Sequence, residues 1–409
     1  TGHPAAAARY IECRLTPLAR ETLFNKPLTK FQRSYDGRKE EPIFLPAKLP
    51  VLLMLGTEGI AVGMSTKILP HNFVELLEAQ IKILRKESFE IYPDFPHGGI
   101  LDVSEYDAGL GKVRVRAKLE ASGDKRIIIR EIPYSTTTES VIASVESAVQ
   151  KNKVKLSSIS DYTTEKVEIE LTLSRGMYAD DVIQQLYAYT DCEVSISVNL
   201  LAIQDRRPYC LRVEEVLHLL TKQLREQIKA ELEYEIGKLE DKQHWLTLEQ
   251  IFIENRVYKR LEKVKTEDGL RQTVYTGMEP YAKKFVRPMD DDDVKRLLAL
   301  PIRRISAFDI EKHRKDIGEI LKELKSLRSK LRQLTKTTIS YLKGLLKKYG
   351  AAYPRRTQIE AFQVVDKRAV ANQNIKLSYD KKSGFFGSAV KGADNQLTVS
   401  EYEFILVIC

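Results

Sequence analysis

The stretch IEKHRKDIGEILKELKSLRSKLRQLTKTTISYLKGL, residues 310–345, decides how the middle of this chain folds. Its apolar side chains recur at three- and four-residue steps along a highly charged sequence, and they are Ile310, Ile317, Ile320, Leu324, Leu327, Leu331, Leu334, Tyr341 and Leu345. A period sustained over this length is typical of a coiled-coil helix. An ordinary helical bundle is the alternative, and the length and the charged outer face of the stretch argue against it.

A second helical stretch with the same period begins at Val213. Its apolar positions are Leu217, Leu220, Leu224, Ile228 and Leu232. Two such arms in one chain, separated by roughly eighty residues, predict an antiparallel coiled coil with a small globular tip.

The segment between the arms contains MDDDDVKRLLALPIRRI, residues 289–305. Its consecutive aspartates, residues 290–293, could suggest a metal site. Acidic residues directly before an apolar helical run are instead favoured by the helix dipole as an N-terminal cap. We therefore predict a helix cap here and no metal.

Residues from about Pro27 to Arg206 indicate mixed α and β structure. KVRVRAKLE, residues 112–120, alternates strictly and predicts a half-buried strand, followed by a turn and a hairpin partner in RIIIREI, residues 126–132. Its outer row consists of Lys112, Arg114, Arg116 and Lys118. A solvated sheet face is the commoner fate of such charges. Four like charges side by side are unfavourable unless phosphates neutralise them, so the row is a candidate DNA-binding surface.

Near the start of the chain, AAAARYIECRLTPLA (residues 5–19) places Tyr10 directly after Arg9. A phenol is a poor nucleophile at neutral pH because its ordinary pKa is near 10. A guanidinium and a phosphate-bound metal ion could favour the phenolate and stabilise a transferring phosphoryl group. Taken alone, the pair has an ordinary alternative, one solvated residue beside one half-buried residue.

Three further motifs follow Tyr10 in order: LPAKLPVLLMLGTEGIAVGMSTKILPHN (residues 45–72), REIPY (130–134) and RRTQI (355–359). Together, in this order and at these separations, the four motifs resemble the A subunit of bacterial type IIA DNA topoisomerases, gyrase A and topoisomerase IV A. The resemblance covers the chain from Ala5 to about Phe362. EPIFLPAKLP, residues 41–50, is closer to the topoisomerase IV version.

The resemblance implies an α+β multidomain fold. Residues 1–26 would be the end of a winged-helix domain with the active-site tyrosine, and residues 27–206 a mixed α/β tower domain. Residues 207–353 would be coiled-coil arms with a helical C-gate dimerisation globule. Residues 354–409 would be a linker and the truncated start of a C-terminal β domain, to which NIKLSYDKKSGFFG (374–387) belongs. We expect the chain to be a piece of a longer protein.

The resemblance also implies the chemistry. Tyr10 would attack DNA phosphodiesters to give a transient 5′-phosphotyrosyl double-strand break, with Arg9 holding a non-bridging oxygen. In the family, a partner B subunit holds Mg²⁺ and binds and hydrolyses ATP. No Glu…Asp-x-Asp arrangement that could replace the B-subunit metal site occurs here in a strand context. The chain would act on double-stranded DNA as a homodimer within an A2B2 holoenzyme. Decatenation and relaxation by ATP-dependent strand passage is the first choice, and gyrase-like negative supercoiling is the alternative.

In GTEGIAVGMS, residues 56–65, no Gly-Lys-Ser/Thr follows the glycines, so the segment is not a Walker A motif. An isoleucine at such a turn is ordinarily a buried loop residue. In the family the isoleucine that matches Ile60 wedges between base steps and bends the duplex. The predicted phosphate contacts around it are Lys48, Lys67 and His71, with capping or packing as the alternative for His71. Family resemblance places the self-association residues at Leu297, Leu298, Leu300 and Ile302.

Composition fits this interpretation without proving it. No apolar run approaches a membrane span, and the four cysteines form no CxxC pair, which fits a reducing cytoplasm and, by resemblance, the bacterial nucleoid. The net charge of +9 favours a polyanionic partner. A non-catalytic coiled-coil DNA clamp would also explain the charge and the heptads. A tyrosine recombinase would place its nucleophile near the C-terminal end of its catalytic domain, whereas Tyr10 lies at the start of this chain.

Overall fold

The computed structural model describes residues 7–404. Within this range it leaves out residues 124, 205, 263, 302–304, 306–308, 364–367, 369–370, 372–374, 381–383, 389, 391–394 and 401. The chain divides into two compact units, and each is described by itself. One consists of residues 1–15, 50–219 and 346–409, and the other of residues 16–49 and 220–345. Helices and strands occur in both, so the predicted α+β class is confirmed.

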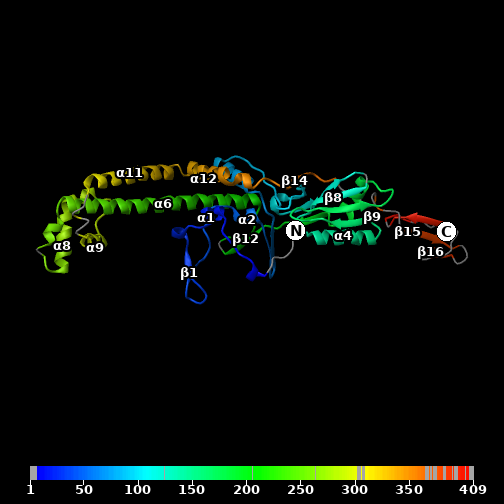
Figure 1. Cartoon of the computed structure of the whole chain (residues 1–409), viewed down its shortest axis with the longest axis horizontal. Coiled ribbons are helices and arrows are strands. Elements are labelled where there is room, and N and C mark those ends of the chain that lie inside the picture. Colours follow the sequence, from blue (N-terminus) through cyan, green and yellow to red (C-terminus); the bar gives the residue numbers. More distant parts are fainter. Residues whose placement is uncertain are drawn as a thin grey trace. The chain divides into compact units, whose positions relative to one another are not determined.

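The first unit contains most of the strands (Figure 1). Its sheets are β11 (Glu193–Ser197), β6 (Lys112–Arg116), β5 (Ile100–Asp102) and β14 (Gln358–Ile359), in that order, and β7 (Lys118–Ala121), β8 (Arg126–Glu131), β10 (Ile169–Leu173) and β9 (Leu156–Asp161). Smaller sheets are β3 (Thr57–Ala61) with β4 (Met64–Ile68), β12 (Leu201–Gln204) with β13 (Arg207–Cys210), and β16 (Phe386–Gly387), β15 (Ile375–Tyr379) and β17 (Asn395–Val399). Its helices are η1 (Ala8–Tyr10), α2 (Val51–Leu55), α3 (Phe73–Arg85), η3 (Asp107–Gly109), α4 (Thr138–Gln150), α5 (Ala179–Tyr189) and η5 (Gly350–Ala352).

One apolar core of this unit lies between α4, α5 and the β7–β8–β10–β9 sheet. Strands β8 and β10 alternate buried with less buried residues, and Ile127, Ile129, Ile169 and Leu171 are fully enclosed. The helices supply Val141, Val145, Val182 and Leu186 to the same cluster. Period-2 patterning on the strands and period-3.6 patterning on the helices thus meet in one apolar layer.

The predicted single strand 112–120 is in fact two strands that belong to different sheets. Val113 and Val115 are buried as the alternation requires, but the strand ends at Arg116 and a second one starts at Lys118. Between them, Ala117 is completely buried and its N–H donates to Cys192 O over 2.7 Å. The predicted hairpin exists as β7 with β8. The row of four cations is therefore divided between two sheets.

RRTQI, residues 355–359, fastens the chain back onto the first unit. Asp94 accepts hydrogen bonds from the N–H groups of Arg356 (3.0 Å) and Thr357 (2.9 Å) and from Asn72 Nδ2 (2.8 Å). Arg355 Nη1 donates to both carboxylate oxygens of Glu75, at 2.8 and 2.6 Å. Gln358 and Ile359 then pair in parallel with β5. The motif thus has a clear structural role in this fold.

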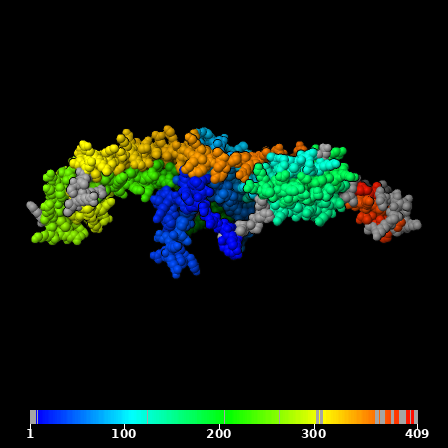
Figure 2. All heavy atoms as spheres, viewed as in Figure 1, coloured from blue at the N-terminus to red at the C-terminus, as the bar shows by residue number. Residues whose placement is uncertain are grey.

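The second unit is built on the two predicted arms. Its elements are α1 (Pro17–Leu23), η2 (Lys26–Leu28), β1 (Phe31–Arg33), β2 (Glu40–Pro42), α7 (Tyr258–Leu261), α8 (Glu267–Met278), η4 (Glu279–Lys284), α9 (Asp291–Leu298), α11 (Ile310–Arg332) and the parts of α6 (Val213–Glu254) and α12 (Leu334–Tyr349) within it. Figure 2 shows the β1–β2 hairpin as a blue lobe that stands clear of the arm helices, and both of its strands are exposed.

Ion pairs between α6 and α11 show that the arms are antiparallel, as predicted. Arg314 pairs with Glu254 at 3.6 Å and Arg328 with Glu240 at 2.6 Å, so residue numbers rise along one helix as they fall along the other. The buried seam consists of Leu224, Ile228, Leu232, Ile236, Ile320, Leu324, Leu327, Leu342 and Leu345.

The second arm is interrupted at Gln333, which corrects the prediction of one continuous seam. Gln333 leaves helical geometry with φ −106° and ψ 44°. Thr337 Oγ1 donates to the carbonyls of Lys330 (2.8 Å) and Gln333 (3.2 Å) around the break. Because the break changes the helical phase, Thr338 and Leu342 become the buried positions, where the heptad had predicted Leu334 and Tyr341. Ile310, at the other end of the predicted seam, is exposed.

The tip has its own apolar core, formed by α6, α7, α8 and α9. Asp290 caps α9 through its side chain, which accepts from Asp293 N (2.9 Å), and Asp293 accepts in return from Asp290 N. The predicted helix cap is therefore confirmed. Buried Asp293 also binds Arg287 and His244, at 2.7 and 3.1 Å.

Candidate functional site

Tyr10 lies in the short helix η1 with its side chain open to solvent. The residue is 73 % exposed, and its N–H donates to Ala7 O at 2.9 Å. The Arg9 guanidinium carbon lies 4.7 Å from the centre of the Tyr10 ring. A phenol presented in this way is accessible to a substrate as large as a duplex, and it has a cation beside it.

The segment around Ile60 is a two-stranded hairpin, β3–β4, where the sequence had suggested only a glycine-flanked turn. Ile60 is 89 % exposed, and Val62 at the turn is fully exposed. Gly63 has φ +76°, which suits glycine at the end of a tight turn. At the base, Gly56 has φ +68° and an added Cβ would lie 2.5 Å from Ile68 O. The hairpin thus presents apolar side chains at its free end.

The base of this hairpin is held by both main-chain and charged groups. Lys67 and Asn199 exchange N–H···O bonds of 2.9 and 3.1 Å, and Asn199 Nδ2 donates to Ser65 O. Lys67 Nζ forms an ion pair with Glu58 at 3.1 Å across the two strands. The charge of Lys67, which was predicted to contact a phosphate, is thereby neutralised in part by Glu58.

His71 is buried inside the protein, behind the hairpin. Its Nδ1 lies 3.3 Å from Leu53 O and its Nε2 lies 3.0 Å from the Tyr106 hydroxyl. Because a carbonyl oxygen only accepts, Nδ1 carries the proton and Nε2 accepts from Tyr106. Burial away from water lowers the pKa of His71 to about 4, against the raising effect of the hydrogen bonds from the ring to backbone. This is the packing role that the sequence left open, and a phosphate contact stays a prediction.

Lys48 belongs to the second unit, where it already has partners. Its ammonium lies 3.0 Å from Glu231 Oε1 on α6 and 5.0 Å from the centre of the Tyr341 ring on α12. The side chain is only 12 % exposed. Its predicted role as a phosphate contact is untested.

The cations of β6 meet carboxylates from the neighbouring strands. Arg114 pairs with Asp102 on β5 at 2.5 Å, and Arg116 with Glu193 on β11 at 2.6 Å. Burial would raise the pKa of Asp102, but hydrogen bonds from Ser104, Phe362 N and Arg114 outweigh it and lower the pKa to about 2. Carboxylates of the protein therefore neutralise Arg114 and Arg116, and DNA phosphates are not needed to do so.

The two ends of the predicted row differ from its middle. Lys112 pairs with Glu105 at 2.9 Å on the surface. Lys118 lies half-buried at the start of β7, opposite Glu131 in the register. DNA binding by the four cations remains a prediction.

The predicted self-association residues lie at the tip. Leu297 is buried in its core, and Leu298 and Leu300 pack against that core with part of their surface exposed. Ile302 falls outside the described residues.

Metal-binding clusters and membrane spans are both absent from the described part of the chain. Among those residues no group of three or more His, Cys, Asp or Glu side chains is arranged to hold a metal ion. No helix within the same residues combines the length and the apolar character that crossing a membrane requires.

Comparison with known proteins decides the family. A family model for the A subunit of DNA gyrase and topoisomerase IV matches residues 1–343. The chain belongs to this family. The A subunit of DNA topoisomerase 4 from Borreliella burgdorferi is 46 % identical over 407 residues, which cover all of this chain and 65 % of the relative.

Other members of the gyrase/topoisomerase IV A-subunit family are more distant. The DNA gyrase A subunit of Lawsonia intracellularis is 32 % identical over 78 % of this chain and 41 % of its own length. The topoisomerase 4 A subunit of Bacillus subtilis is 28 % identical over 88 % of this chain and 46 % of its own length. The chain thus spans less than two thirds of each of these relatives.

Sequence reasoning did not find the carboxylates that pair with the predicted cations of this A-subunit chain. Asp102 and Glu193 reach β6 from strands on either side, and Glu231 reaches Lys48 from a helix distant in the sequence. The local sequence around each carboxylate indicates whether it lies on a strand or a helix. It does not indicate which other strand or helix the carboxylate contacts.

Proposed function

We propose that this chain is the DNA breakage-reunion part of a type IIA topoisomerase A subunit, with Tyr10 as nucleophile. The observation that carries the proposal is the exposed phenol of Tyr10 stacked beside Arg9 in a chain of this family. The chain alone would be inactive or nearly so, because the B subunit would supply Mg²⁺ and ATP hydrolysis.

Cleavage would be a transesterification. The Tyr10 oxygen bonds to phosphorus after losing its proton, the bond from phosphorus to the 3′ oxygen breaks, and that oxygen takes up a proton. Arg9 offsets the negative charge on the non-bridging oxygens in the transition state. The phosphotyrosyl bond keeps the energy of the phosphodiester, so resealing requires no ATP.

The domain roles follow from the same proposal. Residues 27–206 would form the tower that supports a bent duplex, and Ile60 would wedge between base steps at the tip of its hairpin. The arms would carry a C-gate globule that closes a homodimer within A2B2. Strands β15–β17 would belong to a C-terminal β domain. The assembly would act in the cytoplasm on chromosomal DNA.

Topoisomerase IV-like decatenation is the activity we propose first, with gyrase-like supercoiling second. The 46 % identity to a topoisomerase 4 A subunit supports this order, since the gyrase A subunits of Lawsonia intracellularis and Chlamydia pneumoniae are 32 % and 31 % identical. The 28 % identity to the topoisomerase 4 A subunit of Bacillus subtilis tempers it.

The test uses the full-length A subunit with its B subunit, Mg²⁺ and duplex DNA labelled at either end. Detergent trapping should yield protein attached to a 5′ end, and Tyr10→Phe should abolish the adduct. Tyr35→Phe is the matched control, because Tyr35 is also an exposed tyrosine. DNA binding without any adduct in the wild type would favour a non-catalytic coiled-coil clamp, and a 3′ adduct would favour a recombinase.

A further inference from the structure

A single carboxylate, that of Glu231, contacts the segment that follows Tyr10 at two points. Within the second unit, Glu231 Oε1 accepts from Asn25 Nδ2 at 2.8 Å and pairs with Lys48 Nζ at 3.0 Å. Asn25 lies just after helix α1, and Lys48 lies at the end of the segment 16–49. The arm helix α6 therefore holds this segment just after α1 and again near its last residue.

The surroundings of Glu231 make this an enclosed ion pair. Side-chain exposure is 12 % for Lys48 and 25 % for Glu231, and the ammonium also lies over the ring of Tyr341. Lys48 N donates to the carbonyl of Thr22, which is fully buried on α1. A lysine held by main chain, carboxylate and ring at once has little freedom to reach for a phosphate.

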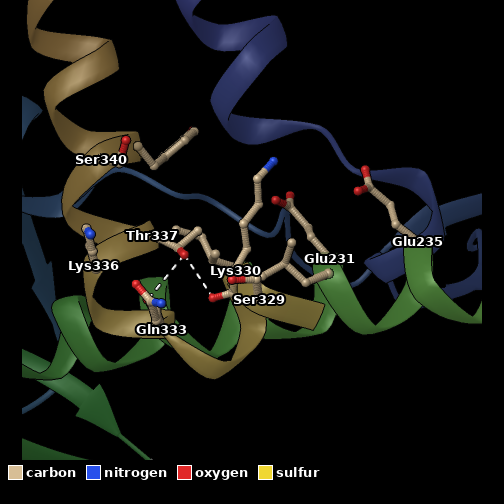
Figure 3. Close-up of a pocket in the computed structure, with 11 residues that line it drawn as sticks. Glu231, Glu235, Ser329, Lys330, Gln333, Lys336, Thr337 and Ser340 are labelled. Carbon is tan, nitrogen blue, oxygen red and sulfur yellow. Dashed lines mark hydrogen bonds between the residues drawn. The ribbon is translucent and has the colours of Figure 1, made fainter. Parts of the chain in front are cut away.

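The clamp adjoins the break in the second arm. Glu231 and Tyr341 line a cavity of about 460 Å³ that is also lined by Gln333 and Thr337. Figure 3 shows the Glu231 side chain rising from α6 toward the N-terminal segment, with Thr337 bonded around the helix break beside it. A change of geometry at the break would therefore reach the clamp through its nearest neighbours.

We propose that Lys48, Glu231 and Asn25 form a positioning clamp through which the arm holds residues 16–49, the segment that follows Tyr10 in the chain. Lys48 then serves cleavage through protein structure, and not as a ligand of DNA phosphate. The inference rests on the proposed function, because its readout is cleavage by Tyr10. Chain continuity supplies the link, since α1 follows Tyr10 after only a short stretch.

Two variants separate the clamp from a phosphate contact: Lys48→Met and Glu231→Gln in the full-length chain, combined with its B subunit. We expect each to lower the single-turnover cleavage rate about tenfold, because small misplacement of a nucleophile is costly. The double variant should be no slower than either single one, since both remove the same interaction. Lys48→Arg should largely retain the wild-type rate.

DNA affinity is measured on the same variants as a function of salt. The clamp predicts an unchanged dissociation constant and salt dependence in both. A phosphate contact would instead weaken binding in Lys48→Met, with a salt slope smaller by about 1, and would leave Glu231→Gln unaffected. That pattern, or wild-type cleavage rates in both variants, would overturn the proposal.

A merely structural effect is controlled by Glu240→Gln, the same substitution on the same helix. Glu240 pairs with Arg328 across the arms at 2.6 Å and lies away from the clamp. It should cleave at the wild-type rate, and all rates are compared at equal folded fraction by thermal melting. If Glu240→Gln slows cleavage as much as Glu231→Gln, the positioning role is wrong. If the wild type gives no adduct, the proposed function fails and the clamp with it.

Discussion

The β3–β4 hairpin and the face of β6 were both predicted to contact DNA, yet the hairpin exposes the side chains at its tip whereas β6 has its arginines enclosed and paired. Ile60 at the hairpin tip is 89 % exposed, an unfavourable position for an apolar residue that a partner would relieve. Arg114 and Arg116 are mostly enclosed and their charge is met by Asp102 and Glu193. Cation count alone therefore does not locate a DNA surface; exposure and local pairing separate a side chain that is available from one that is already engaged.

The largest effect expected is at Ile60. We predict that Ile60→Ala lowers the DNA cleavage rate of the assembled enzyme by about a hundredfold, because the wedge would offset a few kcal/mol of base unstacking in the bent duplex. Duplex bending, measured by energy transfer between end labels, should fall with it. Val62→Ala is the control at the same tip and should stay near wild type. Equal bending in both variants and the wild type would remove the wedge from the proposal.

The second prediction concerns pH and the buried His71 behind the hairpin. Its folded pKa of about 4 lies below the unfolded value of 6.5, so the unfolded state takes up the proton first as pH falls. The contribution of neutral His71 to the free energy of unfolding should thus be fully present above pH 6.5 and should decline toward pH 4, by up to about 3 kcal/mol. Urea unfolding across this range should show the decline, and His71→Gln should flatten that part of it. A histidine that binds phosphate would instead make DNA binding tighter on acidification.

The third prediction removes one of the carboxylates that neutralise the arginines of β6. Asp102→Asn should cost about 2 kcal/mol of stability, since it leaves the mostly enclosed Arg114 with only the longer 3.9 Å pair to Glu193. DNA affinity should be unchanged. Glu105→Gln, which removes the partner of exposed Lys112, is the control and should cost less than about 1 kcal/mol. A marked gain of DNA affinity in Asp102→Asn would mean that the freed guanidinium can reach phosphate.

The sequence predicted helices, caps and hairpins far better than it predicted which distant residues contact one another. The arms, the cap at Asp290 and the β7–β8 hairpin depend on local period, dipole and turn chemistry, and all are present. The break at Gln333 was not predictable from the heptad, because apolar residues continue through it. Of the candidate site, the exposure of Tyr10 and Ile60 agrees with the roles predicted for them. The burial of His71 and the pairing of Lys48 depend on contacts between distant segments, which no spacing reveals.

The smallest effect expected is at Lys67, which lies on the hairpin like Ile60 but is ion-paired like Arg114. Lys67 is paired, but with Glu58 on the surface: the side chains are 28 % and 63 % exposed. Lys67→Met should therefore cost under about 1 kcal/mol of stability. If Lys67 exchanges Glu58 for a phosphate, the salt slope of DNA binding should fall by about 1 in Lys67→Met, and Glu58→Gln should bind DNA more tightly than the wild type. If neither changes, Lys67 belongs with Arg114 among the cations that serve the fold, and the hairpin engages DNA through its apolar tip alone.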